Sequence, residues 1–463
     1  MTTSDETADD AERLAPAAPP QAPRRGGRIA TLARLRARAT RRIAASLSMP
    51  ANERILCTEV IFQGIIESGA MSFLTVFLVR LGAPNWLVGL YSSLPALVII
   101  LTVLPMAPYV QRQRNLVATV NWGRFIFRTV VGLFALLPLL PAHIAPYVLV
   151  GARSAISVPS SVIDVSFTTI LGRATPPERR PTLLSTRLAI HGLVATLFGF
   201  LAGLWLDWIP YPANYQALFV SAFLAAQGSI LVLSRLRLPE QPSPPPTTRH
   251  NSLAGMVALM RDAPAFRRFS LASFLFRLTM SMPSALYAIY RVRTLGASDS
   301  WIGIVLTIER LASVFAYFGL GRTLRRPELR RWLWLATPGA ALYPLLTSLA
   351  TSPEMLILPA VFGGIFSAGV NIFLTNTLLQ VSPEDERPTY AAANTFLANI
   401  TAFVAPMLGT MLADATSITT ALLCIGILRV LGGVIFGRLG VGREAEGVAL
   451  EPRPPATARP PGA

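Results

Sequence analysis

The chain of 463 residues contains no lysine, so all 41 of its basic residues are arginines. Without lysine there is no phosphate-binding loop of the GxxxxGK[ST] type and no amine for Schiff-base chemistry. The sequence therefore argues against an ATP-driven pump domain within this chain and against lysine-based covalent catalysis.

Residues that bind metals or form disulfides are equally scarce. The two cysteines, Cys57 and Cys424, fall in apolar stretches, and of the three histidines only His191 lies well inside such a stretch. Zinc sites and disulfide frameworks need Cys and His at characteristic spacings, which do not occur here. A membrane-embedded enzyme would need clustered carboxylates or histidines, and the acidic run at 384–386 is typical of a solvated loop. We expect no metal, no cofactor and no enzymatic activity.

Charged residues are few, at 14% of the chain, whereas 52% of the residues are hydrophobic and the mean hydropathy is +0.51. These values are typical of a membrane protein with several spanning helices. A formal net charge of +17 would favour nucleic-acid binding in a soluble protein, but here the arginines gather in loops between apolar stretches. The expected partner is therefore a lipid bilayer and not a nucleic acid.

Twelve stretches are apolar and long enough to cross a bilayer as helices. They lie at about 55–79, 87–109, 116–140, 145–170, 183–206, 215–234, 269–290, 301–321, 332–350, 355–380, 390–412 and 417–437. An even number of spans places both termini on one side. With the amino terminus in the cytosol, the cytosolic loops hold seventeen arginines and the outer loops three, which predicts cytosolic termini and an inner (plasma) membrane location.

The segments outside the spans are polar. Residues 1–27 have the composition of a disordered chain, and 28–47 space apolar side chains among arginines, as expected for a helix on the membrane surface or for a basic arm that only fixes topology. A Pro-rich segment follows the sixth span. We expect the following order: an arm at 1–53, a six-helix bundle at 54–235, a linker at 236–267, a second six-helix bundle at 268–438 and a disordered tail at 439–463.

The two halves of the chain repeat one pattern. A shift of 214 residues places LGA at 81–83 over LGA at 295–297 and Asn85 over Asp299. A shift of 207 residues places Asp207 over Asp414. Because each copy has an even number of spans, both copies insert in the same orientation, which predicts parallel repeats about an axis along the membrane normal.

Together these features resemble the major facilitator superfamily of transporters over about residues 50–440. The segments that carry the resemblance are LGAPNWLVGL, ATPPERRPTLLS, RDAPAFRRF and VSPEDERPTYAAAN. The resemblance implies an all-α polytopic membrane protein with twelve transmembrane helices in two parallel-repeat six-helix bundles. The loop motif of the family is degenerate here: Arg112 keeps the basic position but Gln111 replaces the usual acid, and the equivalent loop of the second half keeps Gly321 and Arg326.

Three polar side chains interrupt the first span. Glu59, Gln63 and Glu67 lie at i, i+4 and i+8, so a helix stacks them along one face. A carboxylate near the bilayer centre costs about 2.5 to 3.5 kcal/mol on insertion scales, so this face should contact protein or water. Glu59 lies near the cytosolic boundary, where interfacial water is an equally good explanation. For Glu67 we expect a functional or gating role.

Further candidates come from the cavity that spans one, four, seven and ten line in the superfamily. They are Glu59, Gln63, Glu67, Arg153, Asp164, Ser273, Arg277, Ser281, Asn371 and Thr375, with Asn394 of span eleven added as a cavity residue. The 214-residue shift places the first stripe over Ser273, Arg277 and Ser281, so both halves present polar residues at one level. Arg153 matches a buried arginine of span four that the resemblance links to proton coupling.

An acid that binds a proton beside an arginine that competes for the carboxylate can switch between two states. We predict Glu67 with Arg153 or Arg277 as this pair, the alternative being a static salt bridge between the halves. The spans hold seven arginines against four acids, which favours an anionic group in the solute.

We therefore expect a monomeric secondary transporter of a small organic solute that works by alternating access with H⁺ as the coupling ion, for uptake or for efflux. The alternative is a sensor or scaffold with the same fold that does not transport. Decayed loop motifs suit that alternative, but the matching polar stripes of the two halves do not.

Overall fold

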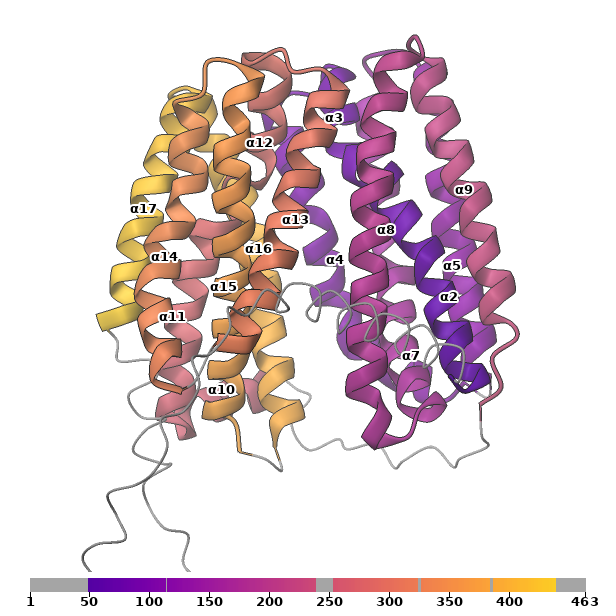
Figure 1. Ribbon diagram of the computed structural model, residues 1–463, viewed down its shortest axis with the longest axis vertical. Coiled ribbons are helices and arrows are strands. Elements are labelled where there is room, and N and C mark those ends of the chain that lie inside the picture. Colours follow the sequence, from indigo (N-terminus) through magenta and orange to yellow (C-terminus); the bar gives the residue numbers. More distant parts are fainter. Residues whose placement is uncertain (1–48, 114, 239–252, 324–325, 384–385, 439–463) are drawn as a thin grey trace, which may run out of the picture. The chain divides into compact units, whose positions relative to one another are not determined.

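The computed structural model describes residues 49–113, 115–238, 253–323, 326–383 and 386–438 (Figure 1). These residues form helices joined by short turns, with no strand among them. The basic segment at 28–47, residues 239–252 of the predicted linker and the predicted tail lie outside the described residues. The predicted all-α class is confirmed.

In the first half of the chain the order is α2 (Ala51–Ile66), η1 (Glu67–Met71), α3 (Ser72–Arg80), α4 (Asn85–Gln111), α5 (Leu116–Leu133), η2 (Phe134–Leu139), α6 (Ala145–Ala155), α7 (Ser157–Ala174), η3 (Pro177–Arg179), α8 (Arg180–Trp208) and α9 (Ala213–Leu233). The second half contains α10 (Leu253–Asp262), α11 (Pro264–Ser281), α12 (Ser284–Ile289), η4 (Tyr290–Thr294), α13 (Asp299–Thr323), α14 (Arg326–Ser348), η5 (Pro353–Leu356), α15 (Ile357–Val381), α16 (Arg387–Ala415) and α17 (Ile418–Arg438).

Ten helical stretches of the described chain are long and apolar enough to cross a membrane. They correspond to predicted spans one to six, eight, ten, eleven and twelve. The remaining two predicted spans are α11, which contains three arginines, and α14, which begins with a charged turn and has two prolines in its interior. The membrane fold is confirmed, and the count of twelve spans stays a prediction.

Two pairs of long helices pack across the two halves of the described chain. In Figure 1, α13 lies beside α8, and α4 packs against α16. One buried apolar cluster continues from Phe73 and Phe77 of α3 to Leu286 and Ile289 of α12. The halves therefore share a core near the ends of α3 and α12.

The first long helix of each half is interrupted at the same point of the repeat. The π-helical turn η1 begins at Glu67, and α11 ends at Ser281, which the 214-residue shift places over Glu67. Pro283 follows, and α12 begins at Ser284. Single π-turns inside α-helices are frequent at functional sites. The last position of the predicted polar stripe thus coincides with a helix interruption in both halves.

A buried arginine compensates for two prolines in the second half. Pro283 and Pro344 have no N–H, so the carbonyls four residues earlier, on Thr279 and Ala340, lose their helical donor. Arg429 of α17, only 2% exposed, donates from Nη2 to Thr279 O (2.8 Å) and from Nη1 to Ala340 O (2.9 Å). Carbonyls inside a bilayer must be satisfied by protein groups. Arg429 therefore joins α11, α14 and α17.

Replacing Arg429 with methionine should lower the free energy of unfolding by about 2 kcal/mol, since buried unsatisfied carbonyls cost about 1 to 3 kcal/mol each and the loss of a buried charge offsets part of this. Unfolding in sodium dodecyl sulfate, followed by tryptophan fluorescence, measures the change. Leu428→Met on the exposed face of the same helix is the control. Equal stabilities of the two variants would contradict this role for Arg429.

Candidate functional site

Glu67 lies opposite a histidine. Its side chain is 55% exposed, and Oε2 lies 3.0 Å from Nε2 of His191 on α8. We predicted Arg153 or Arg277 as the partner, and the structure has His191 in that place instead. The sequence places His191 inside a predicted span. Its contact with Glu67 depends on how α8 crosses the first helix, and no local sequence pattern specifies that crossing.

Arg310 of α13 reaches the same region from the second half. Its Nη2 donates to Ser72 Oγ (2.7 Å), and Ser72 Oγ donates to the carbonyl of Glu67 (2.9 Å). Its Nη1 donates to the carbonyl of Ala195 on α8 (3.0 Å). A Cβ on Gly199 would lie 3.4 Å from this Nη1, so glycine leaves room for the guanidinium. Arg310 is thus bonded to the residue that follows the π-helical turn of Glu67 and to α8, which carries His191.

Glu59 has a different environment. It is 0% exposed, with Oε1 2.8 Å from Arg124 Nη1 and Oε2 3.0 Å from Arg187 Nη2. Both guanidinium groups lie over the ring of Phe167, at 5.3 and 4.8 Å from its centroid. The explanation by interfacial water is therefore wrong, because these neighbours enclose the carboxylate.

The middle residue of the stripe, Gln63, continues this arginine cluster. Arg128 donates from Nη1 to the carbonyl of Ala226 (2.6 Å), and its Nη2 lies 3.5 Å from Oε1 of Gln63. Glu59 is thus one carboxylate within a cluster of three arginines. The three stripe residues share a helix face but have different partners.

The two arginines that we predicted beside Glu67 are both partly buried and lie elsewhere. Arg153 of α6 donates to Ser157 Oγ at 3.3 Å. Arg277 of α11 has no hydrogen-bond or ion-pair partner within the described part of the chain, and its Nε is buried without an acceptor. Arg277 is therefore a guanidinium whose charge no described carboxylate balances.

The other predicted residues are distributed along the helices. Ser273 is buried and donates to the carbonyl of Ser270 (3.1 Å), and Asn371 is exposed with Nδ2 3.5 Å from the hydroxyl of Tyr317. The exposed candidates are Arg112, Asp164 and Thr375, and the half-buried ones are Ser281 and Asn394. Gly321 lies in α13, and Arg326 is the first residue of α14.

Another acid, half-buried, is held within the second half. Tyr343 Oη donates to Oε2 of Glu309 (2.8 Å) and accepts from Nη2 of Arg291 (2.6 Å). The ring of Tyr287 stacks on Tyr343 at 4.5 Å between centroids. Glu309 is therefore fixed on α13 next to Arg310.

Arg80, at the end of α3, binds the second half. It donates to the carbonyl of Ala297 (3.1 Å) and forms an ion pair with Asp299 Oδ1 (2.8 Å). Tyr215 Oη donates to the other oxygen of Asp299 (3.1 Å). One arginine of the first half thus holds the turn before α13.

Arg293 makes the reciprocal contact from the second half to the first. It donates to the carbonyl of Ala83 and to Oδ1 of Asn85 (2.7 Å). The 214-residue shift places Ala83 over Ala297, whose carbonyl accepts from Arg80, and Asn85 over Asp299, whose carboxylate pairs with Arg80. The two turns of the repeat therefore bind one arginine each.

A second pair of contacts is reciprocal in the same way. Asp207, at the end of α8, accepts from the backbone N–H groups of Asp299 (2.8 Å) and Ser300 (3.0 Å) at the start of α13. Asp414, at the end of α16, accepts from Nδ2 of Asn85 (2.6 Å) at the start of α4. We call these residues the double latch: Arg80, Asn85, Asp207, Arg293, Asp299 and Asp414.

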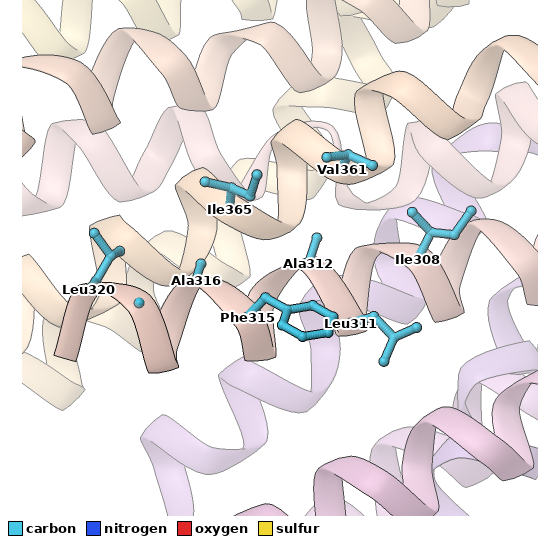
Figure 2. A pocket seen from close by; sticks show the side chains of 9 residues that line it. Ile308, Leu311, Ala312, Phe315, Ala316, Leu320, Val361 and Ile365 are labelled. Atoms are coloured by element: carbon cyan, nitrogen blue, oxygen red, sulfur yellow. The ribbon is translucent and has the colours of Figure 1, made fainter. Parts of the chain in front are cut away.

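An apolar groove of about 670 Å³ lies between α13 and α15. Figure 2 shows Leu311 and Phe315 projecting from α13, with Val361 and Ile365 on α15. The full lining is Ile308, Leu311, Ala312, Phe315, Ala316, Gly319, Leu320, Val361 and Ile365. None of the predicted site residues lines this groove.

The family model of the Major Facilitator Superfamily matches residues 56–345 and 269–461. The chain belongs to this superfamily. It is a multi-pass transmembrane transporter rather than an enzyme, as the sequence predicts. No curated protein sequence matches the chain significantly.

Solved structures of superfamily transporters share the fold at low identity. A bacterial homologue of the human lysosomal transporter Spinster, inward-facing and unoccupied, is 13% identical with a TM-score of 0.63, over 86% of this chain and 98% of that one. The nucleoside transporter NupG is 12% identical with a TM-score of 0.61, over 84% and 99%. The human organic anion transporter MFSD10 is 14% identical with a TM-score of 0.57, over 84% and 100%. At these identities the likeness concerns the fold alone.

Proposed function

We propose that this superfamily member is a proton-coupled secondary transporter of a small organic solute. The observation that carries the proposal is the Glu67–His191 pair at a π-helical turn, with Oε2 and Nε2 3.0 Å apart. Ionisable groups within spanning helices are costly and mark ion pathways and proton relays. A carboxylate hydrogen-bonded to an imidazole can hold and release one proton.

Alternating access is supported by where the two halves are bonded. Among the described residues, each hydrogen bond between the halves involves either a residue of the double latch or Arg310. Arg310 lies further along α13, away from the helix end that carries the latch. With cytosolic termini, the latch closes the outer side. Transport would then require the latch to break while the opposite helix ends come together.

An anionic group in the solute is supported by Arg277. The Glu59 carboxylate is bonded to Arg124 and Arg187, and Arg277 has no acceptor in the described part of the chain. A buried guanidinium without a counter-charge is costly and gains from an anionic ligand. We propose that Arg277 binds a carboxylate or phosphate of the solute.

We further propose an inner-membrane location with both termini in the cytosol, supported by the arginine-rich loops opposite the latch. The double latch joins the two repeats at equivalent turns, which supports bundles at 54–235 and 268–438. We also propose that the transporter acts as a monomer.

The test is solute-induced proton movement in liposomes that contain the purified transporter and a trapped pH-sensitive dye. Adding a pool of organic anions should change the internal pH, a pool of drug-like cations should not, and the change should be absent in Glu67→Gln. Glu354→Gln, an exposed acid in η5, is the matched control and should behave as the parent. If the folded protein gives no pH change with any pool, the result would favour the alternative of a sensor or scaffold that does not transport.

A further inference from the structure

We propose that Arg310 couples proton binding on the Glu67–His191 pair to the movement between the two halves, and that His191 shares this proton with Glu67. The proposal rests on the proposed function, because it names the residues that link its proton step to its conformational step. Neither His191 nor Arg310 was among the residues that the sequence singled out for coupling.

The first support is the position of the guanidinium. Ser72, which accepts from Arg310, donates to the carbonyl of Glu67 and so closes the π-helical turn that carries the acid. Ala195, the second acceptor, lies one helical turn beyond His191 on α8. A shift of α13 relative to α8 therefore changes the distance from Arg310 to both members of the pair at once.

The second support is the set of charges that act on this region. Among the described residues, His191 and Arg310 are the charged groups that interact with Glu67, and Glu67 and Glu309 are those that interact with Arg310. Glu309 lies on the same helix as Arg310 and moves with it. Arg310 can thus leave the first half without losing every counter-charge.

The electrostatic consequence follows from Coulomb interaction. A guanidinium close to the pair disfavours one more positive charge there, and its departure removes that penalty. With the latch closed and Arg310 bonded to Ser72 and Ala195, as observed, the pair is in its proton-poor state. When the halves separate on the latch side, the pair takes one proton from the water on that side. When Arg310 returns, the proton passes to water on the opposite side.

Histidine NMR tests the electrostatic step without any solute. The chain has three histidines, so His143→Gln and His250→Gln leave His191 as the single ¹³C,¹⁵N-histidine signal in lipid nanodiscs. In Arg310→Gln, this signal should respond to acidification at a higher pH than in the parent, because no guanidinium opposes a further positive charge on the pair. Arg153→Gln, which removes an arginine bonded to Ser157 instead, is the control and should respond at the same pH as the parent. A response of Arg310→Gln at the parental pH would overturn the proposal.

Distances between spin labels test the conformational step. Labels at Tyr211→Cys and Thr416→Cys, both exposed at the latch side, report the separation of the halves once Cys57 and Cys424 are replaced by serine. In the parent, acidification should increase the long-distance population. In Arg310→Gln and His191→Gln this response to pH should be lost, whereas Arg310→Lys, which keeps the charge, should retain it.

The outcomes separate the proposal from the function on which it rests. One distance at every pH, in the parent and in the variants, would argue against alternating access itself. Two populations whose ratio still follows pH in Arg310→Gln would overturn the coupling role of Arg310 and leave the transport function standing. If Arg310→Gln does not fold, Arg310→Lys and His191→Gln supply the comparison.

Discussion

Replacing Glu59 with leucine should lower the free energy of unfolding by about 4 kcal/mol, because removing one partner of a buried ion pair leaves uncompensated charge, at a cost of about 3 to 5 kcal/mol. The substitution removes the carboxylate that pairs with both Arg124 and Arg187. Arg128 adds a third positive charge to the same cluster. Because the site is fully enclosed, water cannot replace the missing charge.

Unfolding in sodium dodecyl sulfate with tryptophan fluorescence measures this change. Glu67→Leu, two turns further along the same polar stripe, is the matched comparison: its side chain is 55% exposed, so the stability should fall by less than about 1 kcal/mol while proton-linked transport is lost. The two substitutions should therefore have different effects: loss of Glu59 lowers the stability, and loss of Glu67 abolishes proton coupling. A small stability change in Glu59→Leu would contradict the structural role of its ion pairs.

The double variant Arg80→Gln with Arg293→Gln should move the equilibrium towards states that are open on the latch side by roughly 30-fold. Each arginine donates to a carbonyl and to a side chain of the other half. Because these groups are partly exposed, the contacts of each arginine should stabilise the closed latch by about 1 kcal/mol, or about 2 kcal/mol for both. Because each arginine binds the equivalent turn of the other half, each single variant should give an intermediate shift.

The rate at which a membrane-impermeant maleimide labels Ser93→Cys measures this shift, since Ser93 is fully buried on α4 when the latch is closed. The double variant should label faster than either single variant, and Glu354→Gln, on the same side but outside the latch, should label at the parental rate. Equal rates in the double variant and the parent would show that the apolar contacts alone hold this side closed.

Much of the fold was accessible from the sequence, because bilayer thickness, loop arginines and the internal repeat constrain it strongly. The repeat also indicates latch positions, because it places Asn85 over Asp299 and Asp207 over Asp414. Periodicity likewise placed Glu59 and Glu67 on one face.

What the sequence left open were the partners, which depend on helix crossings. His191 reaches Glu67 only because α8 packs beside η1, and Arg310 joins them from the other half of the chain. Glu59 was judged by its distance from the membrane boundary, although neighbouring helices cover it with guanidinium groups. Pro283 and Pro344 indicate two carbonyls without a helical donor. No local sequence pattern indicates that Arg429 donates to both of them.

The bonds of Arg429 also bear on how the transporter is made. α11 and α14, the two helices with proline-freed carbonyls, are the predicted seventh and ninth spans, which are not among the ten candidate membrane helices of the described chain. Their common donor lies on α17, which leaves the ribosome after both of them. The second half therefore completes its assembly only when its last helix enters the bilayer, and until then two helices depend on lipid headgroups, water or the insertion machinery to cover their open carbonyls.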